Sequence, residues 1–363
     1  MARIANLGRV ECAGALHDFM VSKLFVMPSD TSANWQSWND SDDQWDAIVL
    51  ALPNFTVYQS SRWASHKTSS GWSISRFVHS DLSNTPTTAA QCLVRRTPFN
   101  TAVVWIPGGP IGDLQHINEE LALIIKKTLG VSFIYIRCSV MEGSTPEGTK
   151  QLSSHGWRHC QKVIGARASL MHKLDTDQET RLTRCSSDFR RNLKRSAKIP
   201  SPPYAWRNPN PEEISAAYSL MDEFKRVEGL SLARSVEELQ SLIAAFGDDL
   251  LLYRSDNADG SPLAIRGALR FGDVVWDFIA LTTPAGRKTS ASYAVFWMLA
   301  EKSYQLGITK FDLSGIDPDK NPGVYSFKKG TGAFQVDFQG EWEIASPKWL
   351  LPIASRLVSQ RIS

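Results

Sequence analysis

The sequence predicts a mixed α/β fold made of two similar domains, and three observations indicate it. The chain has 363 residues, more than one ordinary hydrophobic core accommodates. Runs of β-branched and aromatic residues of strand length alternate with helical patterns, as they do in α/β proteins. The same order of elements also occurs once in each half of the chain.

This repeat has the order strand, Pro/Gly loop, helix, strand. In the first half TAVVWIPGGP precedes the helical pattern LQHINEELALIIKKTLG and the strand-like VSFIYIR. In the second half VVWDFIALTTPAG precedes SASYAVFWMLAEKSYQLG and ITKFDLSG. Four residue pairs share one offset of 177 positions: Pro107/Pro284, Gly109/Gly286, Leu129/Leu306 and Gly130/Gly307. A glycine after each helix suits the left-handed cap conformation, so we interpret the pattern as a duplicated unit.

The remaining elements of the second half follow from caps and strand patterns. Asn210-Pro211 followed by two glutamates predicts a helix start, and Ser235 with Glu238 forms a capping-box pattern for another. Three strand-like runs come next: DLLLYR, PLAIRGALRF and DVVWDFIALT, with a turn at 256–260 between the first two. The predicted order is helix, helix, three strands, helix, strand.

The stretch 181–198, RLTRCSSDFRRNLKRSAK, is the most basic in the chain. Ser186 or Ser187 is suited to cap a helix there, and Phe189 and Leu193 form a thin apolar stripe. Two interpretations stay open: a solvated surface helix, or a phosphate-binding helix facing a cleft between the domains.

The predicted boundaries are an N-terminal segment of unknown role at 1–45, a first domain at 46–180 and a basic linker helix at 181–200. A second domain at 201–345 and a C-terminal helix at 346–363 follow. The N-terminal segment contains Trp35, Trp38 and Trp45 among Asp and Ser residues. The C-terminal stretch WLLPIASRLVSQRI is amphipathic; it either packs onto a domain or contacts a membrane surface or a partner.

Composition narrows the class of protein. The formal net charge is only +3, so any anion site must be local. Five scattered cysteines without a C-x-x-C pair argue against a disulfide framework and a zinc site. His155 and His159 lack a third spaced ligand, so no metal is predicted. No signal-peptide pattern or membrane-length apolar run is present, and we expect a cytoplasmic location, with the inner face of the membrane left open.

The sequence resembles the Fem-type aminoacyltransferases, bacterial enzymes of peptidoglycan bridge formation and so of cell-wall biogenesis and cell shape. The resemblance runs from about Phe55 to Ile344 and includes QSSRWASHKTSSGW, IPGGP and SSDFRRNLKRSAK. Its most specific part is FDLSGIDPDKNPGVYSFKKGTGAFQVDFQGEW. It implies two tandem acetyltransferase-like (GNAT-like) domains, in agreement with the repeat. The long helical arm of some members is missing between Asn210 and Asp249.

The resemblance also implies partners and site residues. The partners are aminoacyl-tRNA as donor, with no other cofactor, and a UDP-linked or lipid-linked muropeptide or other glycan precursor as acceptor; DNA is not expected. Lys67, between Trp63 and Trp72, matches a lysine near the precursor diphosphate, and Arg190 or Arg191, with Lys194 beside them, matches the arginine of the basic helix. Phe327 and Lys328 match a Phe-Lys pair near the reacting ester.

The chemistry required is aminolysis of an activated ester, which needs positioning and oxyanion stabilisation rather than a covalent nucleophile. We expect Phe327 to anchor a loop in the core and Lys328 to point its ammonium at the reacting carbonyl or a phosphate. No general base is evident: Asp312, Asp317 and Asp319 are interpreted as turn or capping residues. The sequence does not identify the amino acid transferred, the acceptor amine or the oligomeric state.

Two other functions stay open. The first is a GNAT acyltransferase that uses acetyl-CoA in cell-surface polysaccharide synthesis. Its pyrophosphate loop, R/Q-x-x-G-x-G/A, would correspond to Arg287–Ser292, where both glycines are serine, and to Gly109–Asp113 in the first half. Neither stretch is suited to present free N–H groups to phosphate. The second is a non-catalytic scaffold that binds glycan precursors.

Overall fold

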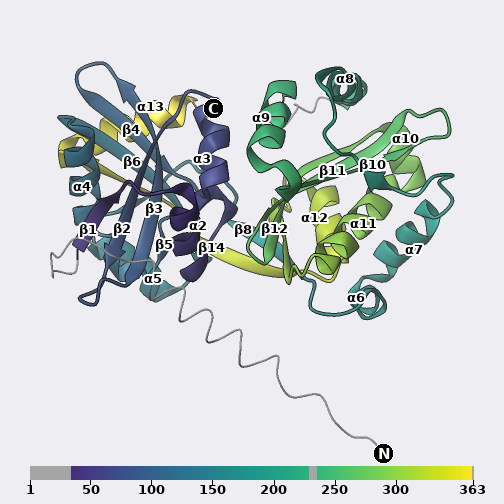
Figure 1. Cartoon of the computed structure of the whole chain (residues 1–363), viewed down its shortest axis with the longest axis horizontal. Helices are drawn as coiled ribbons and strands as arrows, with labels where there is room; N and C mark the ends of the chain where they lie inside the picture. The colour runs from purple at the N-terminus through teal and green to yellow at the C-terminus, as the bar shows by residue number, and fades with distance from the viewer. Residues whose placement is uncertain (1–33, 229–234, 362–363) are drawn as a thin grey trace, which may run out of the picture.

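Two α/β halves lie side by side and share one continuous β-sheet (Figure 1). The computed structural model describes residues 34–228 and 235–361. The strand order in the sheet is β1-β2-β3-β4-β6-β14-β8-β13-β12-β11-β10-β9, with β5 paired to β3 and β7 to β14. Strands β1 to β6 belong to the first half, β8 to β13 to the second, and β14 lies between them.

The first half is built from an antiparallel meander followed by a parallel crossover. Its elements are β1 (Asn34–Trp38), α2 (Asp42–Ala51), η1 (Val57–Gln59), α3 (Ser61–Thr68), β2 (Ser73–Ser80), β3 (Pro86–Thr97), β4 (Thr101–Ile106), β5 (Ile111–Gly112), η2 (Leu114–His116), α4 (Glu119–Leu129), β6 (Phe133–Gly143), α5 (Pro146–Ser154) and β7 (Arg158–His159).

The second half repeats this plan with more helices on its outer face. Its elements are β8 (Ala168–Lys173), α6 (Gln178–Arg184), α7 (Ser187–Ser196), β9 (Tyr204–Ala205), α8 (Pro211–Glu228), α9 (Val236–Phe246), η3 (Gly247–Asp249), β10 (Leu250–Asp256), β11 (Pro262–Phe271), β12 (Val274–Thr282), α10 (Pro284–Thr289), α11 (Ala291–Gln305), β13 (Lys310–Gly315) and α12 (Pro322–Gly330). The chain ends with β14 (Phe334–Ser346), η4 (Lys348–Leu350) and α13 (Leu351–Arg361).

The duplicated unit is present in both halves. In the first, β4 and β6 pair in parallel across α4; in the second, β12 and β13 pair in parallel across α10 and α11. Gly130 and Gly307 follow α4 and α11 with φ values of 63° and 80°, the left-handed conformation expected of a glycine after a helix.

Local start signals also fold as predicted. Ser186 caps α7 through the Phe189 N–H, and Ser235 caps α9 through the Glu238 N–H. The Asn210 side chain accepts from the Glu213 N–H at the start of α8. The basic stretch forms two helices rather than one, since α6 ends before Cys185 and α7 begins after Ser186.

Strand pairing departs from the predicted domain boundaries in three places. Residues 34–38, assigned to a segment of unknown role, form edge strand β1, which pairs with β2; residues 1–33 lie outside the described part. Strand β8, placed in the first domain, pairs with β13. Strand β14 pairs with β8 over Phe334–Asp337 and with β6 over Phe338–Ser346. These pairings join residues distant in sequence, which a local pattern does not reveal.

The interface between the halves is packed. One cluster of buried apolar side chains includes Trp45 and Val57 from the first half together with Leu242, Leu269 and others from the second. The ring of Trp63 lies 5.5 Å from that of Phe278 (centroid to centroid). Helices α3 and α9 are in contact across the interface, and Arg62 of α3 forms an ion pair with Asp249. Because interiors are close-packed, this contact fixes the relative position of the two halves.

None of the helices in the described residues is both long enough and apolar enough to span a membrane.

Candidate active site between the two halves

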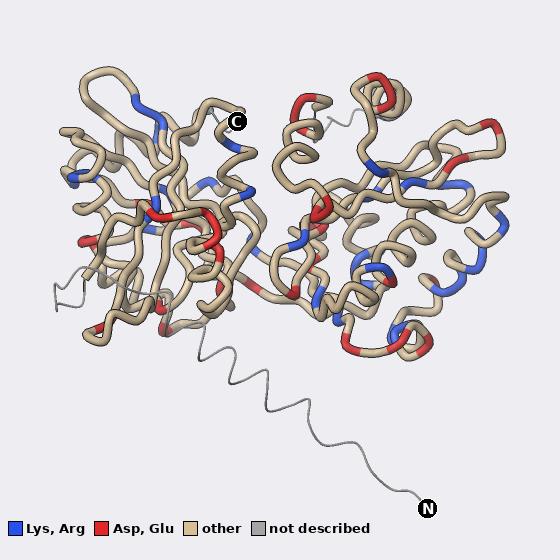
Figure 2. Tube along the Cα trace, in the orientation of Figure 1, with Lys and Arg blue, Asp and Glu red and all other residues tan. Residues whose placement is uncertain are grey.

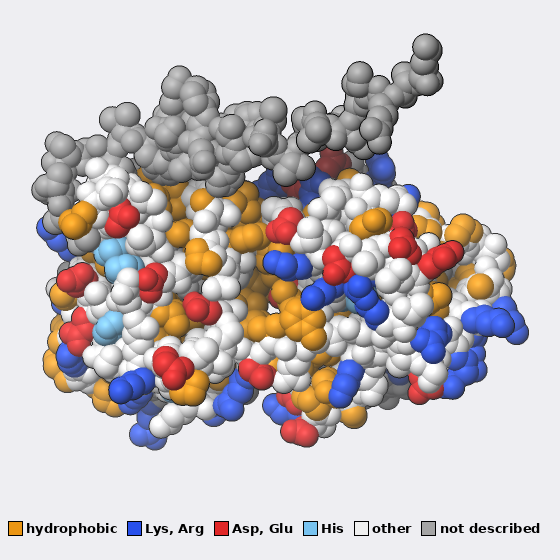
Figure 3. Space-filling model, turned by 90° about the horizontal axis from the view of Figure 1, so that it is seen from below, with side chains coloured by type: hydrophobic (Ala, Val, Ile, Leu, Met, Phe, Trp, Pro, Cys, Tyr) orange, Lys and Arg blue, Asp and Glu red, His pale blue; other side chains and the backbone are white. Residues whose placement is uncertain are grey.

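A cavity of about 270 Å³ lies between the halves. Tyr58, Trp63, Lys67, Trp105, Pro107 and Gly108 contribute from the first half, and Trp276, Phe278, Asp312, Ser314 and Gly315 from the second. The 164–166 loop and β14 supply most of the rest. Figure 3 shows apolar side chains along the seam between the two halves. The walls of the cavity combine apolar and aromatic side chains with a few polar groups, as small-ligand sites do.

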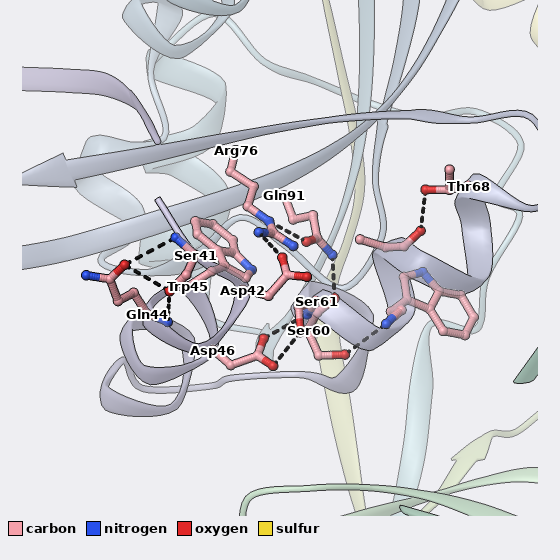
Figure 4. Close-up of polar contacts among 12 residues, drawn as sticks. Ser41, Asp42, Gln44, Trp45, Asp46, Ser60, Ser61, Thr68, Arg76 and Gln91 are labelled. Carbon is pink, nitrogen blue, oxygen red and sulfur yellow. Dashed lines mark hydrogen bonds and ion pairs between the residues drawn. The ribbon is translucent and has the colours of Figure 1, made fainter. Parts of the chain in front are cut away.

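Helix α3 carries the first-half wall of this cavity. Ser60 caps the helix through the Trp63 N–H, and Asp46 accepts from both the N–H and the hydroxyl of Ser61 (Figure 4). Trp63 and Lys67 are four residues apart and therefore share a face. The Lys67 Nζ lies 4.7 Å from the centroid of the Trp63 ring and 3.9 Å from Glu238 Oε1 on α9. Lys67 and Trp63 therefore lie together in the lining of the cavity.

The second-half wall is the end of β13, where its pairing with β12 ends and its register with β8 shifts. The parallel pairing with β12 stops at Trp276–Asp312, and the register with β8 shifts between Asp312 and Gly315. Ser314 has a φ of 62°, an unusual conformation for a non-glycine residue that often marks functional sites. The bulge turns the backbone around Asp312 toward the cavity.

Asp312, which the sequence analysis interprets as a turn or capping residue, lines this cavity. It is 3% exposed, so it is no solvated turn residue, unlike Asp317, which caps the following turn through the Lys320 N–H. Its Oδ1 accepts from the Ser314 N–H at 2.8 Å and from the Ser169 hydroxyl. Oδ2 accepts no hydrogen bond within the described residues. Burial raises the pKa of this carboxyl, and Lys328 partly opposes the rise.

The Phe327–Lys328 pair lies on a helix, not in the predicted loop. Asn321 caps α12 through the Val324 N–H, and Pro322 occupies its first turn, an arrangement that starts helices. The Phe327 ring packs against Phe189 and Tyr293, with centroids 5.8 Å and 4.9 Å away. Its predicted contact with the core is therefore present.

The Lys328 ammonium does not point into the cavity as expected. The side chain is buried, and Nζ donates to the backbone carbonyls of Ser314 and Gly315 at 3.3 Å and 2.8 Å. Burial lowers its pKa, while Asp277 and Asp312 act in the opposite direction. Lys328 therefore holds the bulge that carries Asp312 and supplies positive charge behind it.

The ion pair of Arg266 with Asp277, which is buried, completes the charge cluster. Arg266 on β11 binds Asp277 on β12 through two contacts, Nε to Oδ1 at 3.0 Å and Nη2 to Oδ2 at 2.5 Å. The guanidinium lies 5.0 Å from the Phe327 ring centroid. Two cations and two carboxylates thus meet beneath the cavity, and burial raises the pKa of Asp277 as well.

The basic helix does not face the cleft, which corrects one of the two open interpretations. Helix α7 packs against α11 and α12 on the outer side of the second half, and Figures 1 and 2 show its basic residues away from the first half. Arg190, Arg191 and Lys194 are exposed, and none of them lines the cavity. Phe189 fixes this placement, because its buried ring orients the opposite face of α7 outward.

Trp72 also lies outside the cavity lining. Its ring is 6.3 Å from that of Trp105, which does line the cavity, and Arg95 lies 4.2 Å above it. Trp72 therefore supports the cavity wall rather than forming it.

A buried ion pair orders the 164–166 loop. Glu341 on β14 pairs with Arg137 on β6, and its Oε1 accepts from the N–H groups of Ile164 and Gly165 at 2.9 Å and 2.6 Å. Glu341 thereby fixes one wall of the cavity, a role that depends on the non-local pairing of β14 with β6.

The loops at 109–113 and 287–292, which the sequence analysis compares with a coenzyme A pyrophosphate loop, differ from each other in structure. In the first half, the buried Gln59 side chain accepts from the Gln91 N–H at 2.6 Å and donates to the Pro107 carbonyl at 2.8 Å. A Cβ on Gly109 would lie 2.6 Å from Gln59, so this side chain fills the space beneath the loop. In the second half, Ser290 has a φ of 61°, the left-handed conformation that glycine usually takes.

A second depression, of about 370 Å³, lies in the first half between β1, α2, α3 and β2. Arg76 there donates to Asp42 at 2.6 Å and to Gln91 at 2.9 Å (Figure 4). Its charge is therefore paired. Across the described ranges 34–228 and 235–361, no three His, Cys, Asp or Glu residues are grouped to hold a metal ion.

Comparisons with known proteins agree with this architecture. The model of the acetyltransferase (GNAT) domain family matches residues 183–329. The crystal structure of FemX is similar with a TM-score of 0.71 and 16% identity, over 85% of this chain and 96% of that one. A tandem GNAT protein from the clavulanic acid biosynthesis pathway has a TM-score of 0.51 and 11% identity, over 86% and 98% of the two chains.

A conserved protein of unknown function from Bacteroides thetaiotaomicron is similar with the same TM-score, 0.51, and 11% identity, over 85% of this chain and 98% of that one. No curated protein sequence matches the chain. The chain therefore has the mixed α/β fold of tandem GNAT structures, which confirms the predicted fold class.

Proposed function

We propose that the protein is an acyltransferase that aminolyses an activated ester in the cavity between its halves. Its donor is an aminoacyl-tRNA, and its acceptor is an amine on a UDP-linked or lipid-linked peptidoglycan precursor. The Fem-type motifs of the sequence and the similarity of the fold to FemX support this choice. The observation that carries it is Asp312, a buried carboxyl that lines the same cavity as Lys67 and whose Oδ2 accepts no hydrogen bond within the described residues.

The reaction needs one proton acceptor. The acceptor amine attacks the ester carbonyl, a C–N bond forms, and the C–O bond to the tRNA ribose breaks. Asp312 Oδ2 takes the proton that the amine loses and then gives this proton to the leaving ribose oxygen. Burial raises the pKa of the Asp312 carboxyl and so brings it closer to the pKa of an amine than the pKa of an exposed aspartate is. Proton transfer is efficient when the donor and acceptor pKa values approach each other.

The remaining site residues bind and position. Lys67 binds an acceptor phosphate by exchanging its long contact with Glu238 for a shorter one. Lys328 positions Asp312 through the Ser314 and Gly315 carbonyls. Arg190, Arg191 and Lys194 bind the RNA of the donor on the outer face of α7, since their exposed charges suit a polyanion. The aromatic walls exclude water from the ester.

Calorimetric titration with a UDP-linked muropeptide, followed by single-turnover assays with charged tRNA, tests this proposal. We expect saturable binding that Lys67→Ala weakens about tenfold or more, the size of one lost charge-assisted contact. Asp312→Asn should leave acceptor binding intact and slow turnover about 10²-fold or more. Lys329→Ala is the matched control, because Lys329 is exposed and lies outside the cavity lining. Normal turnover in Asp312→Asn would refute the role of that carboxyl.

Acyl transfer from acetyl-CoA is the second candidate. The family-model match and the left-handed Ser290 at the α10–α11 turn favour it. The same calorimeter measures acetyl-CoA: binding of acetyl-CoA together with failure of the muropeptide to bind would replace the first proposal by this one. If neither binds, the lipid-linked precursor is the acceptor to test next. If that precursor does not bind either, the non-catalytic scaffold is the remaining function.

A further inference from the structure

Helix α13 exposes two large apolar side chains. Ile353 and Leu357 are 52% and 59% exposed, and Trp349, just before the helix, is 61% exposed. Ile353 and Leu357 are four residues apart and therefore share one face of α13. The inward face contains the buried Ser355 and the half-buried Leu351, Ala354, Val358 and Ser359. A surface helix normally has one apolar stripe, which it buries; α13 has a second one, which stays exposed.

Two other segments meet α13 at the same end of the first half. The Asn100 carbonyl, at the tip of the β3–β4 hairpin, accepts from the N–H groups of Ser132 and Phe133. The Phe133 ring lies 5.8 Å from the Trp349 ring. Phe99, at the hairpin tip, is 91% exposed. Figure 1 shows α13 next to β4 and α4 at this end, which we call the α13 surface: residues 95–101, 123–133 and 346–360.

The α13 surface has a one-sided charge. Its three segments contain no Asp or Glu, although the whole chain has a net charge of only +3. Their basic residues are Arg95, Arg96, Lys126, Lys127, Lys348 and Arg356, all exposed or half-buried. Only Lys348 has a carboxylate partner among the described ion pairs, the exposed Glu119 at 2.7 Å. Exposed pairs of this kind are weak, so the positive charge of the surface persists.

We propose that the α13 surface docks the protein onto an anionic phospholipid surface. Trp349, Ile353, Leu357 and Phe99 enter the interface, and the basic side chains extend to the lipid phosphates around them. A second copy of this chain is a poorer occupant, because the like charges of two such surfaces repel. The proposal does not depend on the proposed reaction, since binding is measured without turnover.

Vesicle co-sedimentation tests the proposal with the full-length protein. Phosphatidylcholine vesicles with and without phosphatidylglycerol are compared at low and high salt. We expect binding only to the anionic vesicles, weakened by salt because screening reduces the attraction. The combined variant Trp349→Ser, Ile353→Ser, Leu357→Ser should bind about tenfold more weakly or worse, since it removes the apolar contacts.

Leu82→Ser is the matched control. Leu82 is 72% exposed at the tip of the β2–β3 hairpin, at the other end of β3 from Phe99, so this variant should bind like the unchanged protein. Circular dichroism melting verifies that both variants fold. Equal vesicle binding by the combined variant and the unchanged protein, or no binding to anionic vesicles, would overturn the proposal. So would a dimer in sedimentation equilibrium that the combined variant abolishes.

Discussion

At the scale of single residues, Asp312 and Lys328 influence each other's protonation. The positive charge of Lys328 lowers the pKa of Asp312, against the larger effect of burial, which raises it. Asp312 must be deprotonated to accept a proton, so the proposed turnover falls as pH drops through its pKa. Lys328→Met removes the opposing charge, and we expect the acidic limb of the pH–rate profile to move to higher pH.

The control for this prediction is adjacent in sequence. Lys329 lies next to Lys328 but is exposed, and its Nζ is 5.5 Å from the Tyr325 ring centroid. Lys329→Met should leave the acidic limb in place. A uniform fall in rate without a shift of the limb in Lys328→Met would mean that Lys328 acts only by holding the backbone.

The Arg266–Asp277 pair makes a prediction about stability. Both side chains are 5% exposed, and they form two contacts. Asp277→Asn leaves a buried guanidinium without its counter-ion, which typically costs about 3–5 kcal/mol. Urea denaturation measures the loss. Asp188→Asn breaks the exposed pair with Arg191 and should change stability little; similar losses in both variants would contradict this ranking.

The sequence predicted the place of some cavity residues better than that of others. Lys67 and Trp63 are four apart on one helix, so their common site follows from local spacing. The position of Asp312 in the cavity wall depends on its hydrogen bond from Ser169 and on the change in pairing among β12, β13 and β8. The nearest local signal was a carboxylate at the end of a strand that precedes a glycine-rich turn, and this signal alone equally fits a capping residue.

At the scale of elements, the first-half loop depends on one buried amide. Gln59 joins the Gln91 N–H to the Pro107 carbonyl and is fully buried. Gln59→Ala leaves both backbone groups without their partner, and we expect a loss of ~2 kcal/mol or more in unfolding free energy. Urea denaturation measures it. Gln115→Ala, an exposed control, should be neutral; equal stability of the two variants would show that water replaces the amide.

Elements with local signals were predictable, and those fixed by tertiary contacts were not. The starts of α7, α8 and α9 are determined by side chains within three residues of each cap. Helix α12 looked like a loop because its glycines and proline suggest turns, although Asn321-Pro322 also forms a good helix start. The outward direction of α7 depends on where Phe189 packs, which the amphipathic pattern does not specify.

At the scale of the whole molecule, β14 ties the end of the chain to both halves. Its first residues pair with β8 and its later ones with β6, and a shared apolar cluster crosses the interface. The repeat predicted two units from sequence, and each unit exists. The two units cannot be divided at one boundary in the sequence, because both halves of the sheet include β14 as a strand.

This arrangement predicts that both halves unfold together. Removing packing from the buried Ile136 on β6 destabilises the strand next to β14. Ile136→Ala typically costs about 2–5 kcal/mol, and the loss should reach the second half through β14 and the shared cluster. Hydrogen exchange in increasing urea follows each strand separately. We expect β2 and β11, which lie in different halves, to lose protection at the same lowered urea concentration.

Leu82→Ser, at an exposed hairpin tip, should leave both midpoints unchanged. Loss of protection in β2 while β11 stays protected would mean that the two halves are separate cooperative units and that β14 only tethers them.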